Sequence, residues 1–255
     1  MTWGADAAAT GDLTADYGQV ELHPGAGGHA WIDRDEGLAN GEFGEHVVLV
    51  VARQYGTVRL DVHVLDSAPP VDPAWDAAFE LSVRAGDALT ITGWAGEGSV
   101  VVPVPAGVEV RLRYVVVGGQ EATDHPGDED APGPDRYLVQ VWPSATEPPR
   151  VVASTSPWSQ YWTCGPSAAA LLRELADVPD PGRLVVVLDR ALAAHPDVVE
   201  HLRRGDERYR TGIIRYAQEL FRVTYATGAY AHVRDDDEQL GCLIDERARH
   251  AGGRA

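Results

Sequence analysis

The sequence contains no lysine, and all 21 of its basic residues are arginine. This absence excludes a Walker A site, a Schiff-base mechanism and a Ser-x-x-Lys nucleophile, each of which needs a lysine amine. No stretch approaches the roughly 18 apolar residues that a membrane-spanning helix requires. The segment Met1–Leu13 also lacks the basic n-region of a secretory signal. We therefore expect neither a membrane location nor secretion.

Cysteine is nearly absent as well, because Cys164 and Cys242 are the two that the chain contains. A secreted disulfide scaffold would be denser in cysteine, so a cytoplasmic location is the simpler interpretation. The sequence has no C-x-x-C or H-E-x-x-H motif and its nine histidines are scattered, which predicts no metal site. It also lacks a Gly-x-Ser-x-Gly elbow and a dinucleotide-binding glycine loop, so we predict no cofactor.

Acidic residues, by contrast, are abundant and unevenly placed. The 39 Asp and Glu residues give the chain a formal net charge of −18, and residues 1–150 hold 24 of them against 8 arginines. A field of this sign repels phosphate backbones, so nucleic-acid binding by this part is not expected. It attracts a basic protein partner, although the same charge can serve solubility alone.

The first part of the chain shows the alternation of half-buried strands. In Tyr55–Asp66, Val58, Leu60, Val62 and Val64 fall on one face and polar residues on the other. About eight short strands are predicted between Tyr17 and Trp142, separated by turn residues and without helices between them. This spacing favours an antiparallel β-sandwich, jelly-roll-like or Ig-like. The predicted strands are Gln19–Leu22, His29–Arg34, Glu45–Arg53, Tyr55–Asp66, Ala78–Arg84, Ala88–Thr92, Ser99–Val104, Val108–Val117 and Arg136–Trp142.

The pattern becomes helical after a segment rich in Pro, Ser and Thr. In Ser167–Ala176 the apolar residues Ala168, Leu171, Leu172 and Leu175 form one stripe. Further helices are predicted over Arg183–Ala194, Asp197–Arg204, Asp206–Tyr225 and Asp235–His250. The fold class is therefore α+β: an acidic β-sandwich domain over residues 1–145, a linker over 146–166 and a smaller helical region over 167–255.

Two loops of the first part are candidate binding surfaces. Asp66–Trp75 is rich in proline and predicts a surface crossing, and Glu121–Asp135 holds six acidic residues with two glycines and three prolines. The second loop cannot bury apolar area and is expected to be mobile. Its oxygen ligands would suit calcium, but their spacing matches no EF-hand loop. Trp75 is a candidate anchor for a partner, or else it seals the edge of the core. The predicted binding residues are Asp124, Asp128, Glu129, Asp130 and Trp75.

One short segment has the pattern of a nucleophile site. Cys164 is followed by Gly-Pro and an apolar helix, a position where the helix dipole lowers the pKa of a thiol. The stretch Gln160–Ser167 resembles the nucleophile segment of papain-like bacterial cysteine peptidases. That resemblance implies Cys164 as the nucleophile, Gln160 as the oxyanion donor and His232, followed by Asp235, as the base. The alternative is a small buried cysteine at a helix entry.

A longer stretch resembles a group of uncharacterised β-sandwich proteins of high-GC bacteria. The resemblance is carried by Leu60–Val83, with its Ala-Pro-Pro loop and tryptophan, by Asp135–Pro143 with Arg-Tyr-Leu-x-Gln-x-Trp-Pro, and by Arg150–Trp162. It covers residues 45 to 162 and implies the fold but no activity. In size, acidity and lack of catalytic motifs the chain is similar to immunity proteins that neutralise toxins.

The sequence thus favours a non-enzymatic, cytoplasmic protein-binding or regulatory protein. In its most concrete form this is an immunity-like inhibitor, whose acidic loops cover a basic site on a toxin or nuclease. Two alternatives stay open. One is a cysteine hydrolase that uses Cys164, and the other is a structural subunit of an assembly that docks through an apolar patch on the predicted helix Asp206–Tyr225.

Overall fold

The computed structural model describes residues 7–32, 37–42, 44–176, 183–205, 209–214, 243–244 and 246–249. The chain divides into two compact units, Met1–Ser159 and Gln160–Ala255. The first unit is rich in antiparallel strands and the second is helical, so the fold is mixed, with a β-rich part followed by helices, as predicted. Among the described residues, no helix combines the length and the apolar character that crossing a lipid bilayer requires.

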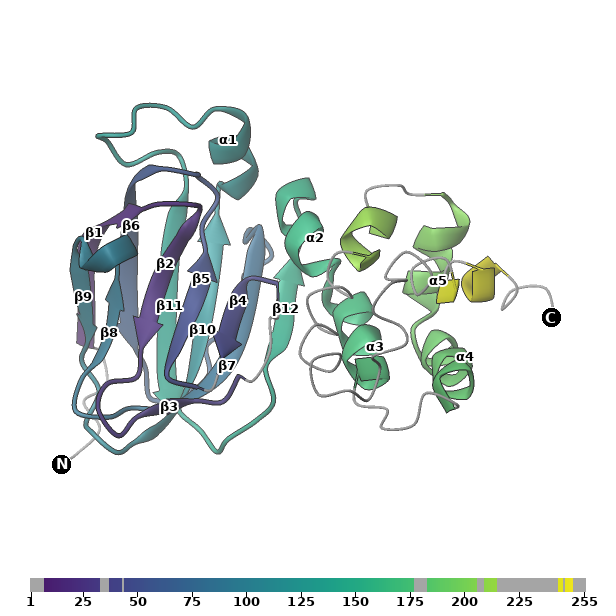
Figure 1. The fold of residues 1–255 in the computed structure, drawn as a ribbon, viewed down its shortest axis with the longest axis horizontal. Coiled ribbons are helices and arrows are strands. Elements are labelled where there is room, and N and C mark those ends of the chain that lie inside the picture. Colours follow the sequence, from purple (N-terminus) through teal and green to yellow (C-terminus); the bar gives the residue numbers. More distant parts are fainter. Residues whose placement is uncertain are drawn as a thin grey trace. The chain divides into compact units, whose positions relative to one another are not determined.

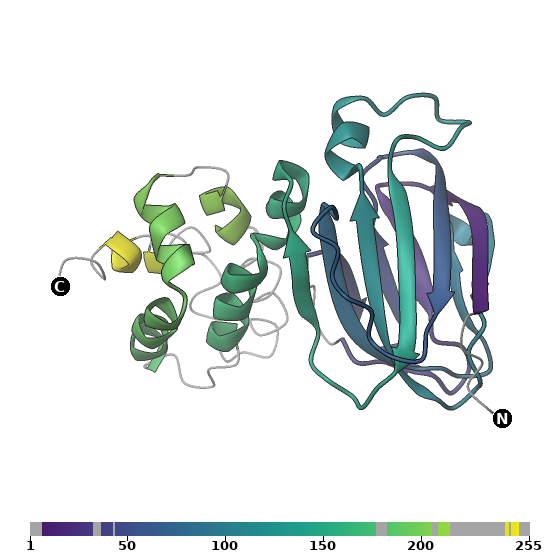
Figure 2. The same cartoon turned by 180° about the vertical axis from the view of Figure 1, so that it is seen from behind.

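Two β-sheets lie face to face in the first unit (Figure 1), and the view from behind brings the first sheet to the front (Figure 2). The first sheet has the order β1-β6-β11-β10-β7-β12, with β3 also paired to β7, and the second has the order β4-β5-β2-β8-β9. Strands of the first sheet are β1 (Ala7–Ala15), β3 (His29–Ala30), β6 (Gly56–Val64), β7 (Ala77–Arg84), β10 (Glu109–Val117), β11 (Arg136–Pro143) and β12 (Arg150–Ser154). Strands of the second are β2 (Gln19–His23), β4 (Ala39–Glu42), β5 (His46–Val50), β8 (Leu89–Thr92) and β9 (Ser99–Val102).

The core lies between the two sheets, because the strands alternate as the sequence indicates. On β6, the four predicted residues Val58, Leu60, Val62 and Val64 are all buried. Two hydrogen bonds link the first sheet to the end of β5 and the residues just after it. The Tyr114 hydroxyl donates to the Val50 carbonyl at 2.8 Å, and the Ala52 amide donates to the Tyr137 hydroxyl at 2.8 Å. These bonds tie the tyrosine hydroxyls inside an otherwise apolar layer.

Pairing departs from the prediction in one place. β6 and β11 run parallel, with Leu60 opposite Tyr137, whereas the other strand pairs are antiparallel. A parallel pair needs a long crossover connection, which in most proteins is a helix. Here the chain between Val64 and Arg136 makes the crossover mainly with strands.

Several elements were not predicted. β1 is rich in alanine and threonine and carries a weak apolar pattern, yet it pairs with the whole length of β6. β12 and the whole of helix α2 (Pro157–Thr163) fall in the segment predicted as a linker over 146–166, and β12 pairs with β7. That segment is therefore largely a strand and a helix. The remaining helices of the first unit are α1 (Gly119–Asp124) and the 3-10 turn η1 (Trp94–Gly96).

The second unit contains the predicted helices wherever it is described. These are α3 (Pro166–Ala176), α4 (Leu184–Ala194) and α5 (Pro196–Arg203). The α3 stripe of Ala168, Leu171, Leu172 and Leu175 is buried, as its 3.6-residue period predicts. Of the predicted helix Asp206–Tyr225, residues 209–214 are described and helical, and most of Asp235–His250 lies outside the described residues.

Candidate functional site

Arg53, which follows β5, is buried at one end of the first unit with 1% of its surface exposed. Its guanidinium donates to three backbone carbonyls of the predicted acidic loop: Pro126 at 3.1 Å, Asp128 at 3.5 Å and Ala131 at 3.0 Å. Its Nε also lies 3.4 Å from Oδ1 of Asp135, whose side chain is 1% exposed. The buried guanidinium therefore supplies hydrogen-bond donors to carbonyls of the acidic loop, which are not paired with a strand.

Asp135 is held from a second side. The Tyr137 hydroxyl donates to its other carboxylate oxygen, Oδ2, while accepting from the Ala52 amide. Burial, together with the negative charge of Asp135, raises the pKa of Tyr137 well above its ordinary value. The hydroxyl consequently stays protonated and remains a donor across the whole physiological pH range.

Two glycines let the loop approach this closely. A Cβ on Gly133 would lie 1.7 Å from Nη2 of Arg53, and one on Gly56, whose φ is +110°, would lie 2.6 Å from the Glu129 carbonyl. That carbonyl accepts from the Thr57 amide at 2.9 Å. The loop is thus fastened both to Arg53 and to the start of β6, which corrects the expectation that it is simply mobile.

The four acidic residues predicted to bind a partner all point into solvent around the buried Arg53. The side chains of Asp124, Asp128, Glu129 and Asp130 are all exposed. Asp124 ends α1 and accepts from the Gln120 amide at 3.0 Å, and Asp128 accepts from the Asp130 backbone amide at 3.0 Å. Among the described residues, no group of three or more His, Cys, Asp or Glu residues is arranged to hold a metal ion. The loop thus directs three carbonyls at Arg53 and exposes these four carboxylates, whereas its last residue, Asp135, is buried.

A second buried cluster lies on the outer face of the first sheet. Glu80 of β7 is 0% exposed and is the shared acceptor of Arg111 and Arg113 of β10, which are 1% and 3% exposed, and of Arg150. Burial by itself raises the pKa of the Glu80 carboxyl. The hydrogen bond from Arg113 and the three nearby guanidinium charges outweigh that effect and hold the pKa below its ordinary value. Glu80 is therefore ionised at neutral pH.

This cluster fastens two loops to the sheet. Arg113 donates to the carbonyl of Pro69 at 3.0 Å, in the predicted loop Asp66–Trp75. Arg111 donates to the carbonyls of Glu147 and Pro148 at 2.9 Å each, and Ser82 exchanges hydrogen bonds with the Glu147 backbone. The burial of these arginines was not predicted, although Arg111 and Arg113 lie two residues apart in the predicted strand Val108–Val117.

Trp75 belongs to this second cluster and is not an exposed anchor. It is 8% exposed and packs in a small hydrophobic group with Ala78, Val115 and Ala153. The Arg113 guanidinium lies 5.6 Å from the centre of the Trp75 ring and 5.0 Å from that of Trp142. Of the two interpretations that the sequence left open, the structure supports the one in which Trp75 seals the core edge.

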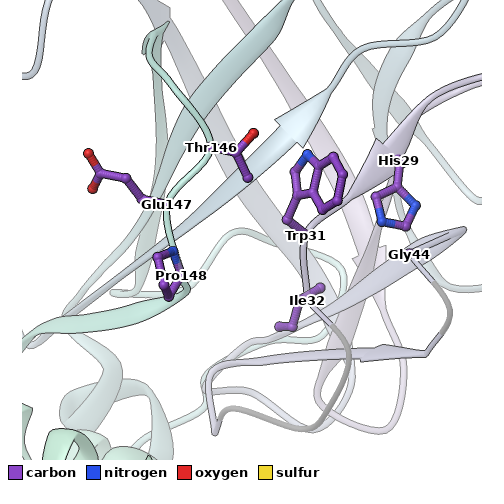
Figure 3. Close-up of a pocket in the computed structure, with 7 residues that line it drawn as sticks. All are labelled: His29, Trp31, Ile32, Gly44, Thr146, Glu147 and Pro148. Atoms are coloured by element: carbon purple, nitrogen blue, oxygen red, sulfur yellow. The ribbon is translucent and has the colours of Figure 1, made fainter.

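The loop held by Arg111 forms one wall of a pocket of about 430 Å³. Figure 3 shows the Trp31 ring between Thr146 on one side and His29 on the other, with the Glu147 carboxylate directed away from Trp31. Trp31 is 42% exposed, and its Nε1 donates to the Glu109 carboxylate at 3.2 Å. The pocket has the volume of a small-ligand site. Its described lining is His29, Trp31, Ile32, Gly44, Thr146, Glu147 and Pro148.

The cysteine of the hydrolase hypothesis is buried. Cys164 is 0% exposed, and this burial raises the pKa of its thiol well above the ordinary value. The direction is opposite to the predicted lowering, because removal from water outweighs the helix start that follows. Gln160 lies one turn earlier on α2, where its carbonyl accepts from the Cys164 amide at 2.9 Å. The other predicted members, His232 and Asp235, lie outside the described residues.

The docking patch predicted on Asp206–Tyr225 is partly described. Tyr209 and Ile213, two residues of its apolar side, are 5% and 2% exposed, so these two positions are buried and not open for docking. The rest of that segment lies outside the described residues.

Comparison with known proteins adds little to this geometry. No protein-family model matches the chain, and no curated protein matches it. Among solved structures it is similar to a protein titled "Crocagin biosynthetic gene J", with 18% sequence identity and a TM-score of 0.38, over 56% of this chain and 100% of that one. At this level the likeness gives no ground for assigning a function.

Proposed function

We propose that this protein is a non-catalytic binding or regulatory protein that engages a basic protein partner through the acidic loop Glu121–Asp135. In its most concrete form it is an immunity-like inhibitor that covers a basic site on a toxin or nuclease. The two face-to-face sheets would then be the jelly-roll-like or Ig-like β-sandwich that the sequence predicts, acting in the cytoplasm.

The observation that carries the proposal is the way Arg53 holds the loop. Three carbonyls of the loop point at one buried guanidinium, while the side chains of Asp128, Glu129 and Asp130 stay in solvent. A loop fixed before it meets its partner loses less conformational entropy on binding than a free one. The carboxylates are therefore presented in a set arrangement.

The charge of the surrounding unit supports the same partner class. Residues 151–159 carry no charge, so the whole of Met1–Ser159 has the net charge of −16 found for residues 1–150. A field of this size speeds encounter with a positively charged protein and repels nucleic acid. Association governed by it weakens as salt is added.

A pair of matched variants tests the proposal. Glu129→Gln with Asp130→Asn removes two carboxylates from the loop, and Glu45→Gln with Glu147→Gln removes two exposed carboxylates elsewhere in the same unit. We expect full-length protein, and the Glu45/Glu147 variant, to retain one basic protein from extract of the source organism in a salt-dependent manner. The Glu129/Asp130 variant should bind it about 30-fold more weakly, since two partly desolvated charges at about 1 kcal/mol each contribute about 2 kcal/mol. Equal retention by both variants, or the absence of any basic protein, would overturn the proposal.

A labelling experiment separates this proposal from the hydrolase alternative. With Cys242 replaced by serine, Cys164 should react with iodoacetamide in the native protein at least about 100-fold more slowly than in urea, because the buried thiol is protonated. Fast labelling at pH 7 would instead indicate an activated thiolate and favour the hydrolase.

A further inference from the structure

Two exposed tyrosines and a half-buried tryptophan form an aromatic group beside the acidic loop. The Tyr17 ring lies between those of Tyr55 and Trp94, with ring centroids 5.9 and 5.8 Å apart and edge-to-face geometry. Tyr17 is 63% exposed and Tyr55 is 46% exposed. Large aromatic rings that are left open to solvent in contact with one another are typical of surfaces that bind another molecule.

The turn that presents Tyr17 does not favour a tyrosine. Tyr17 and Gly18 form a two-residue turn between β1 of the first sheet and β2 of the second, with φ of +53° and +71°. An isolated antiparallel bridge between Asp16 and Gln19 closes the turn. Two positive φ values in such a turn suit Asn or Gly, and a tyrosine there is held in a conformation that its Cβ disfavours. The ring is thus kept exposed at a backbone position where a smaller residue would be more stable.

The aromatic group adjoins the acidic loop. Tyr55 immediately precedes Gly56 and Thr57, which contact the Glu129 carbonyl, and the Gly18 amide donates to the carbonyl of Gln54 at 2.9 Å. Figures 1 and 2 both show the segment after α1 reaching over the ends of β6 and β1. Open aromatic rings and outward carboxylates therefore share one end of the first unit.

We propose that this surface, made of Tyr17, Tyr55, Trp94 and the Glu129 side of the acidic loop, binds an arginine-bearing segment of the basic partner. A guanidinium is planar and weakly hydrated, so it stacks on aromatic rings while its N–H groups pair with carboxylates, whereas a lysine ammonium stacks less well. The net charge of −16 on this unit makes a cationic occupant the complementary one. The inference rests on the proposed function and specifies which chemistry of the partner is recognised.

The test uses two probe peptides of equal length and charge, one with arginine and one with lysine at every charged position. Full-length protein should bind the arginine peptide about three- to tenfold more tightly than the lysine peptide, measured by calorimetry at two salt concentrations. In the variant with Tyr17→Asn and Tyr55→Ser, that preference should disappear. Asn suits the positive φ at position 17, so the variant is expected to keep its fold, which a melting curve checks.

A matched control removes an exposed tyrosine elsewhere. Tyr161, 47% exposed and in the second unit, is changed to serine, and the preference for the arginine peptide should remain. The Glu129→Gln, Asp130→Asn variant should bind both peptides more weakly, and its affinity should depend less on salt.

The outcomes separate the two proposals. If the tyrosine variant binds both peptides as the natural chain does while the carboxylate variant loses both, the aromatic inference is overturned and the proposed function stands. If neither variant changes binding, both are overturned. If sedimentation shows a dimer that the tyrosine variant breaks, the occupant is a second copy of this chain, and the arginine-bearing partner is rejected.

Discussion

The first unit has two buried arginine clusters, one around Arg53 and one around Glu80. Both hold loops in place through backbone carbonyls, but they differ in the ratio of arginines to carboxylates. At one end, Arg53 and Asp135 form a one-to-one pair that gathers the carbonyls of the acidic loop. On the outer face of the first sheet, one carboxylate, Glu80, pairs with three arginines. Two of these, Arg111 and Arg113, are buried and donate to the carbonyls of two proline-containing loops. In both cases a buried guanidinium replaces the hydrogen-bond partners that a strand would have supplied.

What differs is the surface that each cluster leaves outside. The loop on Arg53 contains acidic residues, so its side chains form a charged surface that is suited to meeting a partner. The loop on Arg111 contains Thr146 and Pro148, and with Trp31 it forms a pocket. Buried arginines thus hold each loop through its backbone, whatever its side chains are. The exposed side chains of the loop then decide what kind of surface it forms.

The largest expected effect comes from the cluster with one carboxylate. Glu80→Gln leaves Arg111 and Arg113 buried without a compensating charge, and we expect the free energy of unfolding to fall by about 3–5 kcal/mol. Urea denaturation followed by circular dichroism measures it. A loss below about 1 kcal/mol would mean that the loop carbonyls alone satisfy the two guanidinium groups. The Glu80 cluster would then be no more sensitive to the loss of its charge partner than the Arg53–Asp135 pair.

The one-to-one pair should be somewhat less sensitive. Arg53→Met leaves Asp135 buried but still bonded to Tyr137, so we expect a loss of about 3 kcal/mol and faster proteolysis between residues 125 and 135. Arg59→Met is the matched control, because the Arg59 side chain is 43% exposed and should change stability by less than about 0.5 kcal/mol. Unchanged proteolysis of the loop in Arg53→Met would refute the anchoring role.

Acid should act on the Glu80 cluster in a defined direction. The folded-state pKa of Glu80 is below the value of 4.5 that it has when unperturbed, so the unfolded chain takes up its proton first as the pH falls. The stability from this group is complete well above pH 4.5 and is lost as the pH falls through the lower folded-state pKa. Urea midpoints measured from pH 6 downward should decline less steeply at the acid end in Glu80→Gln than in the natural chain. Parallel curves would contradict this.

The smallest effect is expected outside both clusters. Arg59 and Asp12 form an exposed ion pair of 3.3 Å between β6 and β1. Asp12→Asn should change the free energy of unfolding by less than about 0.5 kcal/mol, because water screens the pair. A loss comparable to that of Arg53→Met would show that burial is not what separates the clusters from ordinary surface pairs.

Sequence patterns predicted the regular parts of the first unit better than its anchors. The period of two in β6 placed all four core residues correctly, because one face of that strand is apolar. On β7 and β10 both faces are buried, and the outer face carries Glu80, Arg111 and Arg113. Polarity normally signals exposure, so a pattern of alternating residues does not predict that these three are buried.

The candidate site was predicted in the same uneven way. Local composition was enough to locate the acidic loop and its exposed residues Asp124, Asp128, Glu129 and Asp130. The anchor Arg53 lies 73 to 78 residues before the carbonyls that it binds, and no local pattern links it to the loop. For Trp75 the sequence left two interpretations, since whether a loop tryptophan is buried depends on the sheet face beneath it.

The edge of β7 has a consequence for how the chain folds. Two short strands that are distant in sequence, β3 and β12, share that edge: His29–Ala30 pairs with Val83–Arg84 and Arg150–Ser154 pairs with Ala77–Glu80. Contacts of such long sequence separation slow folding, because the loops between them must close first. During synthesis the edge stays open until Ser154 has left the ribosome, and an open sheet edge can pair with a neighbouring chain. Nascent chains that stop before residue 150 should therefore be prone to aggregation.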